Sequence, residues 1–211
     1  SISANTRPLI DSRAATLAND DALKKSAART RHAELDVINA SDVTLVVSET
    51  ERELLAIDAS SACVDVLSNL HEVAGSGLSF TERKDLVFVG GFRHTPNVDA
   101  VQWFVEDVFP LVRTQLPGIA FHCIGADPPA SIQALSQYQG VRIHGHVPDL
   151  EPAMRGMRLS IAPLRFGAGV KGKINMAMSY GLPVVATPMA VEGMHVHNGK
   201  DVVVADEAKG F

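Results

Sequence analysis

Short apolar runs alternate along this chain with stretches in which apolar residues recur at helical spacing. Each run is short and continuous, which predicts buried strands over residues 86–90, 119–125 and 141–145. The stretches between and after them predict helices from residue 95 to about 112, over 129–138 and over 149–156. Strands that alternate with helices in this way favour an α/β fold with a doubly wound parallel sheet.

The helix after the first of these strands carries the clearest signals. Thr95 is predicted as its N-cap and Pro96 as its first helical residue, where a missing N–H costs nothing. Pro110 should kink or end the helix. Trp103 is expected to pack against neighbouring side chains, not to stack on a cofactor.

The first seventy residues follow a less regular pattern. A loose end, one or two helices and two strands are expected over residues 1–11, 12–39, 43–47 and 63–67, in that order. Ser48 is predicted as the N-cap of a short helix over 49–56, with Glu51 completing a capping box. Residues 71–83 are rich in glycine, serine and charge, and indicate a linker.

One stretch, residues 160–188, combines a strand, a glycine-rich loop, a helix and a second strand. The three glycines of residues 167–172 allow the backbone to turn and to approach a ligand closely. Apolar spacing predicts a helix that begins near Gly169, with Gly181 as its C-terminal cap. Residues 183–187 then predict a buried parallel strand, and Asn198-Gly199 predicts a tight turn before another at 202–205.

Lys171 and Lys173 fall in the first turn of the helix predicted near Gly169. The helix dipole disfavours a cation there by about 0.3–1 kcal/mol per charge, so stability alone does not explain the pair. An anion bound at the helix start would explain both lysines, and a phosphate or diphosphate is the natural candidate. The alternative is that both are solvated residues beside a glycine-rich turn.

The segment GGFRHTPN, residues 90–97, forms a second basic and glycine-rich connection between a strand and a helix. Gly90 and Gly91 end the strand, and Arg93 and His94 precede the helix. An arginine in this position can hold a phosphate through two hydrogen bonds. Ligands of doubly wound sheets bind beyond the carboxyl ends of the strands, so both loops are predicted to share that edge.

Histidine and cysteine positions add little chemistry to this picture. His144 and His146 could share one face of a strand, but no Cys or acidic residue follows at a spacing typical of metal sites. No metal is therefore expected, and His146 is placed in the ligand cleft. Cys63 and Cys123 lie in apolar runs and are interpreted as buried free thiols.

Charge and hydropathy exclude two classes of partner. A formal net charge of −5 over 211 residues argues against a general nucleic-acid binder, which needs a basic surface. No apolar run approaches the roughly 20 residues that a membrane-spanning helix needs. A cytoplasmic protein is expected, with peripheral association with a membrane left open.

Three segments, in order, resemble the C-terminal half of a group 1 (family 4) glycosyltransferase: FVGGFRHTPNVDAVQWFVEDVFPLVR, IHGHVPDLEP and LSIAPLRFGAGVKGKINMAMSYGLPVVATPMAVEGM. The resemblance spans residues 84–211 and implies the GT-B fold, which has two Rossmann-like domains. It implies a bacterial enzyme that moves a sugar from a nucleotide-diphosphate donor to an unknown glycan or lipid-linked acceptor. Transfer is expected to be retaining and metal-independent, with no cofactor.

The same resemblance implies a domain organisation. Residues 1–70 correspond to the end of the acceptor-binding domain and its crossover, 71–83 to a linker, and 84–211 to a donor-binding domain truncated at its C-terminus. Enzymes of this family are longer, so the chain is expected to be a fragment that is inactive alone. Apolar surface left exposed over residues 12–69 would favour a homodimer.

The resemblance also assigns binding residues, although no catalytic one. The groups expected around the diphosphate, nucleobase and transferred sugar are Gly90, Gly91, Phe92, Arg93, His94, His146, Val147, Ala168, Gly169, Val170, Lys171, Lys173 and Met176. Gly91, Arg93 and Lys173 would contact the diphosphate. His146-Val147 would lie near the base, and Ala168 to Val170 would face the sugar.

The chain departs from the family pattern at two positions. Two glutamates usually stand eight residues apart, and here Ala168 and Met176 replace them. A thioether accepts a ribose hydroxyl only weakly, so either other groups bind the ribose or donor binding is weak. Two alternatives stay open: a non-catalytic nucleotide- or carbohydrate-binding module, and a nucleotide-sugar epimerase of the same architecture.

Overall fold

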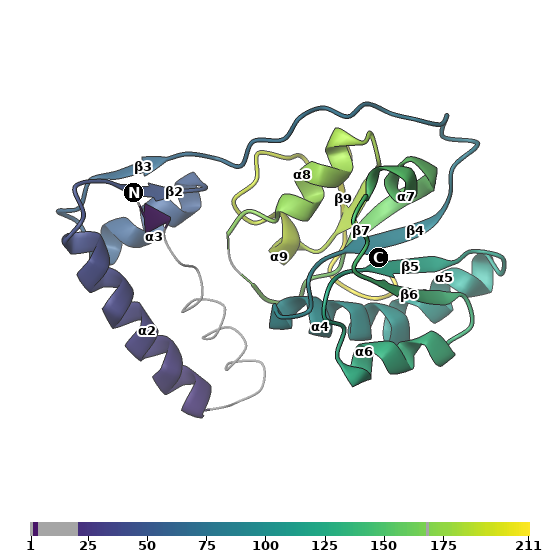
Figure 1. Ribbon diagram of the computed structural model, residues 1–211, viewed down its shortest axis with the longest axis horizontal. Helices are drawn as coiled ribbons and strands as arrows, with labels where there is room; N and C mark the ends of the chain where they lie inside the picture. Colours follow the sequence, from purple (N-terminus) through teal and green to yellow (C-terminus); the bar gives the residue numbers. More distant parts are fainter. Residues whose placement is uncertain (1, 4–20, 168) are drawn as a thin grey trace. The chain divides into compact units, whose positions relative to one another are not determined.

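A computed structural model describes residues 2–3, 21–167 and 169–211 of the chain (Figure 1). The chain divides into two compact units. The first comprises the described residues of Ser1–Leu70, Phe166–Val170 and Val191–His195, and the second comprises His71–Arg165, Lys171–Ala190 and Val196–Phe211. The domain boundaries expected from the sequence stay a prediction.

The described residues of the first unit form a three-stranded parallel sheet and two helices. Its elements are β1 (Ile2–Ser3), α2 (Asp21–Asn39), β2 (Thr44–Val46), α3 (Glu49–Asp58) and β3 (Val64–Val66), with strand order β1-β2-β3. Ser48 caps α3 as predicted, because its Oγ accepts the N–H of Glu51 at 3.3 Å. The Glu51 carboxylate in turn accepts the N–H of Val47, one residue before the cap, at 3.0 Å.

Two expectations for this unit are corrected. Ile2 and Ser3 pair in parallel with Thr44 and Leu45, where the sequence predicts a loose end. The other residues of 1–11, and residues 12–20, lie outside the described residues. The interpretation of Cys63 as buried is wrong, because this exposed residue precedes β3, an edge strand of the sheet.

The second unit contains a six-stranded sheet whose paired strands all run parallel. Its order is β6-β5-β4-β7-β8-β9, with β4 (Lys84–Val89), β5 (Phe121–Ile124), β6 (Val141–Gly145), β7 (Met157–Ala162), β8 (Val184–Ala186) and β9 (Val203–Val204). The strand order reverses direction between β4 and β7. The predicted doubly wound parallel sheet is confirmed.

Helices cover both faces of this sheet. Figure 1 shows α4 (Thr95–Trp103), α5 (Phe109–Gln115) and α6 (Ala130–Ala134) on one face, and α7 (Glu151–Gly156) and α8 (Gly172–Ser179) on the other. The 3₁₀ turn η2 (Leu135–Gln137) extends α6, and the short α9 (Pro188–Val191) follows β8. Among the described residues, no helix is long and apolar enough to cross a membrane.

Pro110 perturbs the helix after β4 without ending it. One π-helical turn, η1 (Phe104–Val108), joins α4 to α5, and the N–H of Phe109 donates to the carbonyl of Phe104 five residues back. The wider turn accommodates a proline ring that would clash with a carbonyl in a regular α-helix. At the other end, α4 begins at Thr95 with His94 as its cap, so the prediction of Thr95 as cap is wrong by one residue.

Aromatic side chains form the core between the sheet and this helix. Phe104 lies 4.7 Å from Phe121 and 5.8 Å from Phe109, measured between ring centroids, and all three are fully buried. Trp103 packs edge-on against Phe211 at 5.8 Å, which confirms its expected packing role. Cys123 on β5 is buried, as predicted.

The C-terminal end of α8 also follows the prediction. Gly181 has a φ of 63°, and its N–H donates to the carbonyl of Met178 while that of Leu182 donates to Ala177. This pattern is the Schellman motif, in which glycine takes the left-handed conformation. The predicted turn at Asn198-Gly199 is also present, with a hydrogen bond of 2.7 Å from Gly199 N–H to the carbonyl of Val202.

Candidate functional site

The loop after β4 lies along the carboxyl end of β5. The N–H of Gly90 donates to Ile124 at 2.9 Å, and the N–H of Phe92 donates to Ala126 at 3.0 Å. The two segments approach so closely that a Cβ on Gly125 would lie 2.0 Å from the carbonyl oxygen of Gly90. Only glycine fits at position 125, and this contact fixes the path of the loop.

Gly90 is equally constrained, but by side chains. A Cβ there would lie 2.8 Å from Nδ2 of Asn97 and 2.9 Å from Nζ of Lys173. Asn97, in the first turn of α4, is buried and donates from Nδ2 to the carbonyl of Gly91 at 2.7 Å. Its Oδ1 accepts a hydrogen bond of 2.5 Å from Nζ of Lys173. The loop after β4 and the lysine on α8 therefore meet at one amide group.

Helix α8 begins at Gly172, so the prediction of a start near Gly169 is wrong. The φ angles of Gly167 and Gly169 are 146° and 70°, and a right-handed helix requires negative values. Lys171 is consequently the N-cap of α8, and Lys173 is its second helical residue. Both lysines still lie at the start of the helix that follows β7.

The ammonium of Lys173 is enclosed, whereas the residue as a whole is half-buried. Its Nζ lies 4.1 Å from the ring centroid of Phe88 on β4, a cation–π contact. Desolvation lowers the pKa of Lys173 to about 7, Cys123 acts in the opposite direction, and the charge of Lys171 lowers it further. Lys171 is itself buried, at 8% exposure. The carboxyl edge thus carries two lysines, Lys171 and Lys173, and burial makes the charged form of Lys173 costly.

Arg93 extends from the same loop into solvent. Its side chain is 87% exposed, and its Nε donates to Oδ2 of Asp127 at 2.7 Å. An exposed ion pair of this kind contributes only about 0–1 kcal/mol, so an incoming anion can compete for the guanidinium. His94 beside it is the N-cap residue of α4.

The remaining expected residues are more dispersed. His146 is exposed and Val147 half-buried directly after β6, which β5 separates from β4 in the sheet. Met176 is half-buried on α8, one turn after Lys173, and Phe92 is buried at 5% exposure. Gly169 and Val170 belong to the first unit, and Ala168 lies outside the described residues.

Two polar residues at this edge escaped the sequence analysis. Asn97 is one, and its only sequence signal is a polar residue in the first turn of a helix that follows a glycine loop. Arg165, after β7, is the other: its Nε donates to Oδ2 of Asp99 at 2.9 Å, and its Nη2 donates to Oδ1 of the same carboxylate. This bidentate pair ties the loop after β7 to α4.

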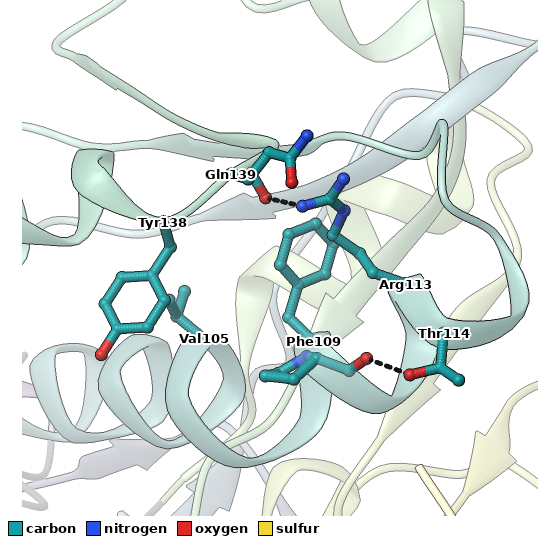
Figure 2. A pocket seen from close by; sticks show the side chains of 7 residues that line it. Val105, Phe109, Arg113, Thr114, Tyr138 and Gln139 are labelled. Atoms are coloured by element: carbon teal, nitrogen blue, oxygen red, sulfur yellow. Dashed lines mark hydrogen bonds between the residues drawn. The ribbon is translucent and has the colours of Figure 1, made fainter.

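A pocket of about 390 Å³ lies at the amino ends of the strands, which we call the amino edge of the sheet (Figure 2). Phe109, Arg113 and Tyr138 are among the side chains that line it. Arg113 donates to the carbonyl of Gln139, just before β6, and to that of Pro117, in the segment leading to β5, at 2.6 and 2.9 Å. The pocket therefore sits at the amino ends of the strands, away from both glycine loops.

The histidines do not assemble a metal centre in the described part of the chain. His144 stacks on His122 of β5 with ring centroids 5.0 Å apart, and its Nε2 lies 3.1 Å from Nδ1 of His122. No group of three or more His, Cys, Asp or Glu side chains among the described residues is placed to hold a metal ion.

A family comparison covers the region that contains this site. Residues 83–211, well over half of the chain, match the family described as glycosyl transferases group 1. No curated protein sequence matches the chain significantly.

Several solved structures share the fold at low sequence identity. TarM of S. aureus superposes with a TM-score of 0.70 and 15% identity, over 84% of this chain and 36% of TarM. HepE of Anabaena, solved with UDP and glucose, has a TM-score of 0.63 and 13% sequence identity, over 89% of this chain and 55% of HepE. A UDP-forming α,α-trehalose-phosphate synthase of Burkholderia vietnamiensis has a TM-score of 0.58 and 10% sequence identity, over 86% of this chain and 51% of the synthase. The chain therefore spans between about a third and just over half of these proteins.

Proposed function

This chain belongs to the group 1 glycosyl transferases with the GT-B fold, and we propose that residues 84–211 bind the diphosphate of a nucleotide-sugar donor. The reaction would transfer the sugar with retention, without a metal ion, to a glycan or lipid-linked acceptor in the bacterial cytoplasm. One observation carries the proposal. The ammonium of Lys173 and the loop of Gly90 and Gly91 meet at the carboxyl edge, beside the point where the strand order reverses.

The arrangement supplies the groups that a diphosphate needs. Helices α4 and α8 both begin at this edge, so their N-termini present partial positive charge to an anion. A Cβ on Gly91 would meet nothing within 4 Å, which leaves room above the loop backbone for a ligand. The exposed guanidinium of Arg93 can add a bidentate contact.

These cations would act on the leaving group. In the transfer, the bond between the sugar anomeric carbon and the diphosphate oxygen breaks. The acceptor hydroxyl oxygen would bond to the same face of the carbon and lose its proton to the departing diphosphate. Negative charge then grows on the departing diphosphate, and Lys173 and Arg93 would stabilise it. An anion beside Lys173 favours its charged form, so donor binding would raise the pKa of this lysine above its value in the free protein.

Met176 and Ala168 favour a second candidate, a nucleotide-binding module without transferase activity. Neither side chain can accept a strong hydrogen bond from a ribose or sugar hydroxyl. A protein that binds the nucleotide diphosphate, yet releases no nucleotide from any nucleotide sugar in the presence of acceptors, would support this candidate over the transferase.

Titration calorimetry with UDP, GDP and ADP tests the proposal. UDP comes first, because a TarM mutant and HepE were each solved in complex with it. We expect one nucleotide to bind saturably, with the same affinity in EDTA and in magnesium. Lys173→Met, which keeps an apolar stem and removes the charge, should weaken binding by at least about tenfold, since a hydrogen bond to a charged group contributes about 1.5–3 kcal/mol.

Lys200→Met is the matched control, because Lys200 is an exposed lysine of the same unit in the turn before β9. Its affinity should equal that of the unmodified chain. Binding of none of the three nucleotides, or equal binding by the Lys173→Met variant, would contradict the proposed site.

A further inference from the structure

We propose that Asn97 is the positioning residue of the donor site, holding Lys173 and the loop after β4 in the arrangement that receives a diphosphate. The inference rests on the proposed function for the identity of the ligand. The contacts that carry it belong to the protein alone, so it can be tested separately.

The amide of Asn97 joins two segments that are far apart in the sequence. Nδ2 donates to the carbonyl of Gly91 at 2.7 Å, and Oδ1 accepts from Nζ of Lys173, 76 residues later, at 2.5 Å. A carbonyl can only accept and an ammonium can only donate, so the orientation of the amide is fixed by chemistry. Asn97 is 5% exposed, which limits competition from solvent for either bond.

The geometry leaves little freedom around these two bonds. Both Nδ2 of Asn97 and Nζ of Lys173 lie within 3 Å of the place where a Gly90 Cβ would be. The backbone of Gly90 is in turn fixed by its N–H bond to Ile124 and by its contact with Gly125. The amide and the ammonium are therefore packed directly against the loop backbone.

The partner of Lys173 is neutral, which sets it apart from other cations at this edge. Arg93 and Arg165 each pair with a carboxylate, that of Asp127 and Asp99 respectively. The groups that face the Lys173 ammonium are the Phe88 ring on β4, the Cys123 thiol on β5 and Lys171 at the start of α8. Burial raises the pKa of Cys123 to about 12, so this thiol carries no charge at neutral pH.

A neutral acceptor fits the task of positioning. It holds the ammonium by a hydrogen bond and leaves its positive charge uncompensated for an incoming anion. An aspartate at position 97 would neutralise that charge and could not donate to Gly91. An alanine would remove both bonds. The two replacements should therefore shift the pKa of Lys173 in opposite directions, although both should weaken the binding of a diphosphate.

The experiment measures the pKa of Lys173 by NMR of ¹³C- and ¹⁵N-labelled lysine side chains in the free protein, with Lys173→Met to assign the signal. Relative to the unmodified chain, Asn97→Ala should lower this pKa, because the charged form loses its acceptor, and Asn97→Asp should raise it. Both variants should bind UDP and inorganic pyrophosphate at least about fivefold more weakly. Asn198→Ala is the control, since it removes an asparagine amide whose Oδ1 accepts a hydrogen bond from the N–H of Val204, elsewhere in the unit.

An unchanged Lys173 pKa in both Asn97 variants would overturn the inference, as would unchanged pyrophosphate and UDP binding in a chain that binds them. If Asn97→Ala does not fold, Asn97→Asp, which has nearly the same shape, decides the question. If the unmodified chain binds no diphosphate, the proposed function fails, while the pKa comparison still decides whether Asn97 positions Lys173.

Discussion

Two cations of the second unit are held in different ways at opposite edges of one sheet. At the amino edge, Arg113 donates to the carbonyl of Gln139 (Figure 2). It also donates to the carbonyl of Pro117, and so fastens segments that lead into β6 and β5. At the carboxyl edge, Lys173 is held by the neutral amide of Asn97 and the ring of Phe88. The pocket of about 390 Å³ lies at the first edge, and the buried ammonium of Lys173 lies at the second.

Under the proposed function, the partners of a charged group are a better guide to the ligand site than the pocket beside it. Nη1 and Nη2 of Arg113 are used to connect parts of the chain, so these two donors are not available to an anion, whereas its buried Nε has no hydrogen-bond partner among the described residues. Burial makes the charged form of Lys173 costly, and its pKa is lowered to about 7. A ligand anion would offset that cost, which supports the proposed placement of the ligand at the carboxyl edge.

The largest effect of a single substitution at neutral pH should come from filling the contact beneath the loop. Gly125→Ala would place a Cβ 2.0 Å from the Gly90 carbonyl oxygen, so the backbone of one segment has to move. Overpacking of this kind costs about 1–3 kcal/mol and sometimes more, and we expect a loss of about 3 kcal/mol in the free energy of unfolding. Urea denaturation measures it, and nucleotide binding should be lost as the loop shifts.

Gly91→Ala is the matched control for that change. Gly91 lies in the loop after β4, next to the residue that the Gly125 Cβ would strike, but a Cβ on Gly91 would meet nothing within 4 Å. The expected change in unfolding free energy is within about 0.5 kcal/mol, as for an ordinary surface substitution. Equal destabilisation by the two alanines would show that packing under the loop does not hold this edge together.

Much of this edge could be predicted from the sequence, because parallel strands buried on both faces appear as continuous apolar runs. The runs that became β4, β5 and β6 were therefore recognisable. The start of α8 was not, since Val170 fits the helical spacing while the positive φ angles of Gly167 and Gly169 exclude a helix there. Spacing reports which face a residue would occupy and says little about backbone conformation in a glycine-rich loop.

The candidate site shows a similar division. Gly90, Gly91 and Lys173 could be proposed one at a time, because glycine after a strand and lysine at a helix start are local patterns. Their meeting at Asn97 depends on the packing of α8 and α4 against one sheet, and no local pattern encodes a contact across 76 residues. The same holds for Cys63, whose exposure depends on which strand is at the edge.

The contribution of Lys173 to the free energy of unfolding should depend on pH. The pKa of Lys173 is lowered to about 7 from an ordinary 10.5, so between these values the unfolded chain binds the proton that the folded chain has lost. Stability of the unmodified chain relative to Lys173→Met should therefore rise as the pH rises from about 7 to 10.5, by up to about 1.4 kcal/mol per pH unit. Urea denaturation of both proteins across this range measures the difference.

Other titrating groups cancel in that comparison, because both proteins contain them. Saturating UDP should flatten the slope near pH 7, since a bound diphosphate keeps Lys173 charged. A difference between the two proteins that does not change with pH would show that the ammonium is solvated, and Lys173 would then resemble an ordinary surface lysine.

The smallest changes are expected from replacing one arginine at each edge, and they compare the roles of the two edges in stability and in nucleotide binding. Arg113→Met removes two hydrogen bonds to carbonyls that water can partly replace, so we expect a loss of about 1 kcal/mol in unfolding free energy and no change in the affinity for UDP.

Arg93→Met should leave stability nearly unchanged and weaken nucleotide binding. The exposed pair of Arg93 with Asp127 contributes little stability, while the nucleotide loses a contact and binds several-fold more weakly. Urea denaturation and calorimetry on both variants give four values. Weakened nucleotide binding in Arg113→Met would mean that the amino-edge pocket communicates with the ligand, and the contrast between the two edges would fail.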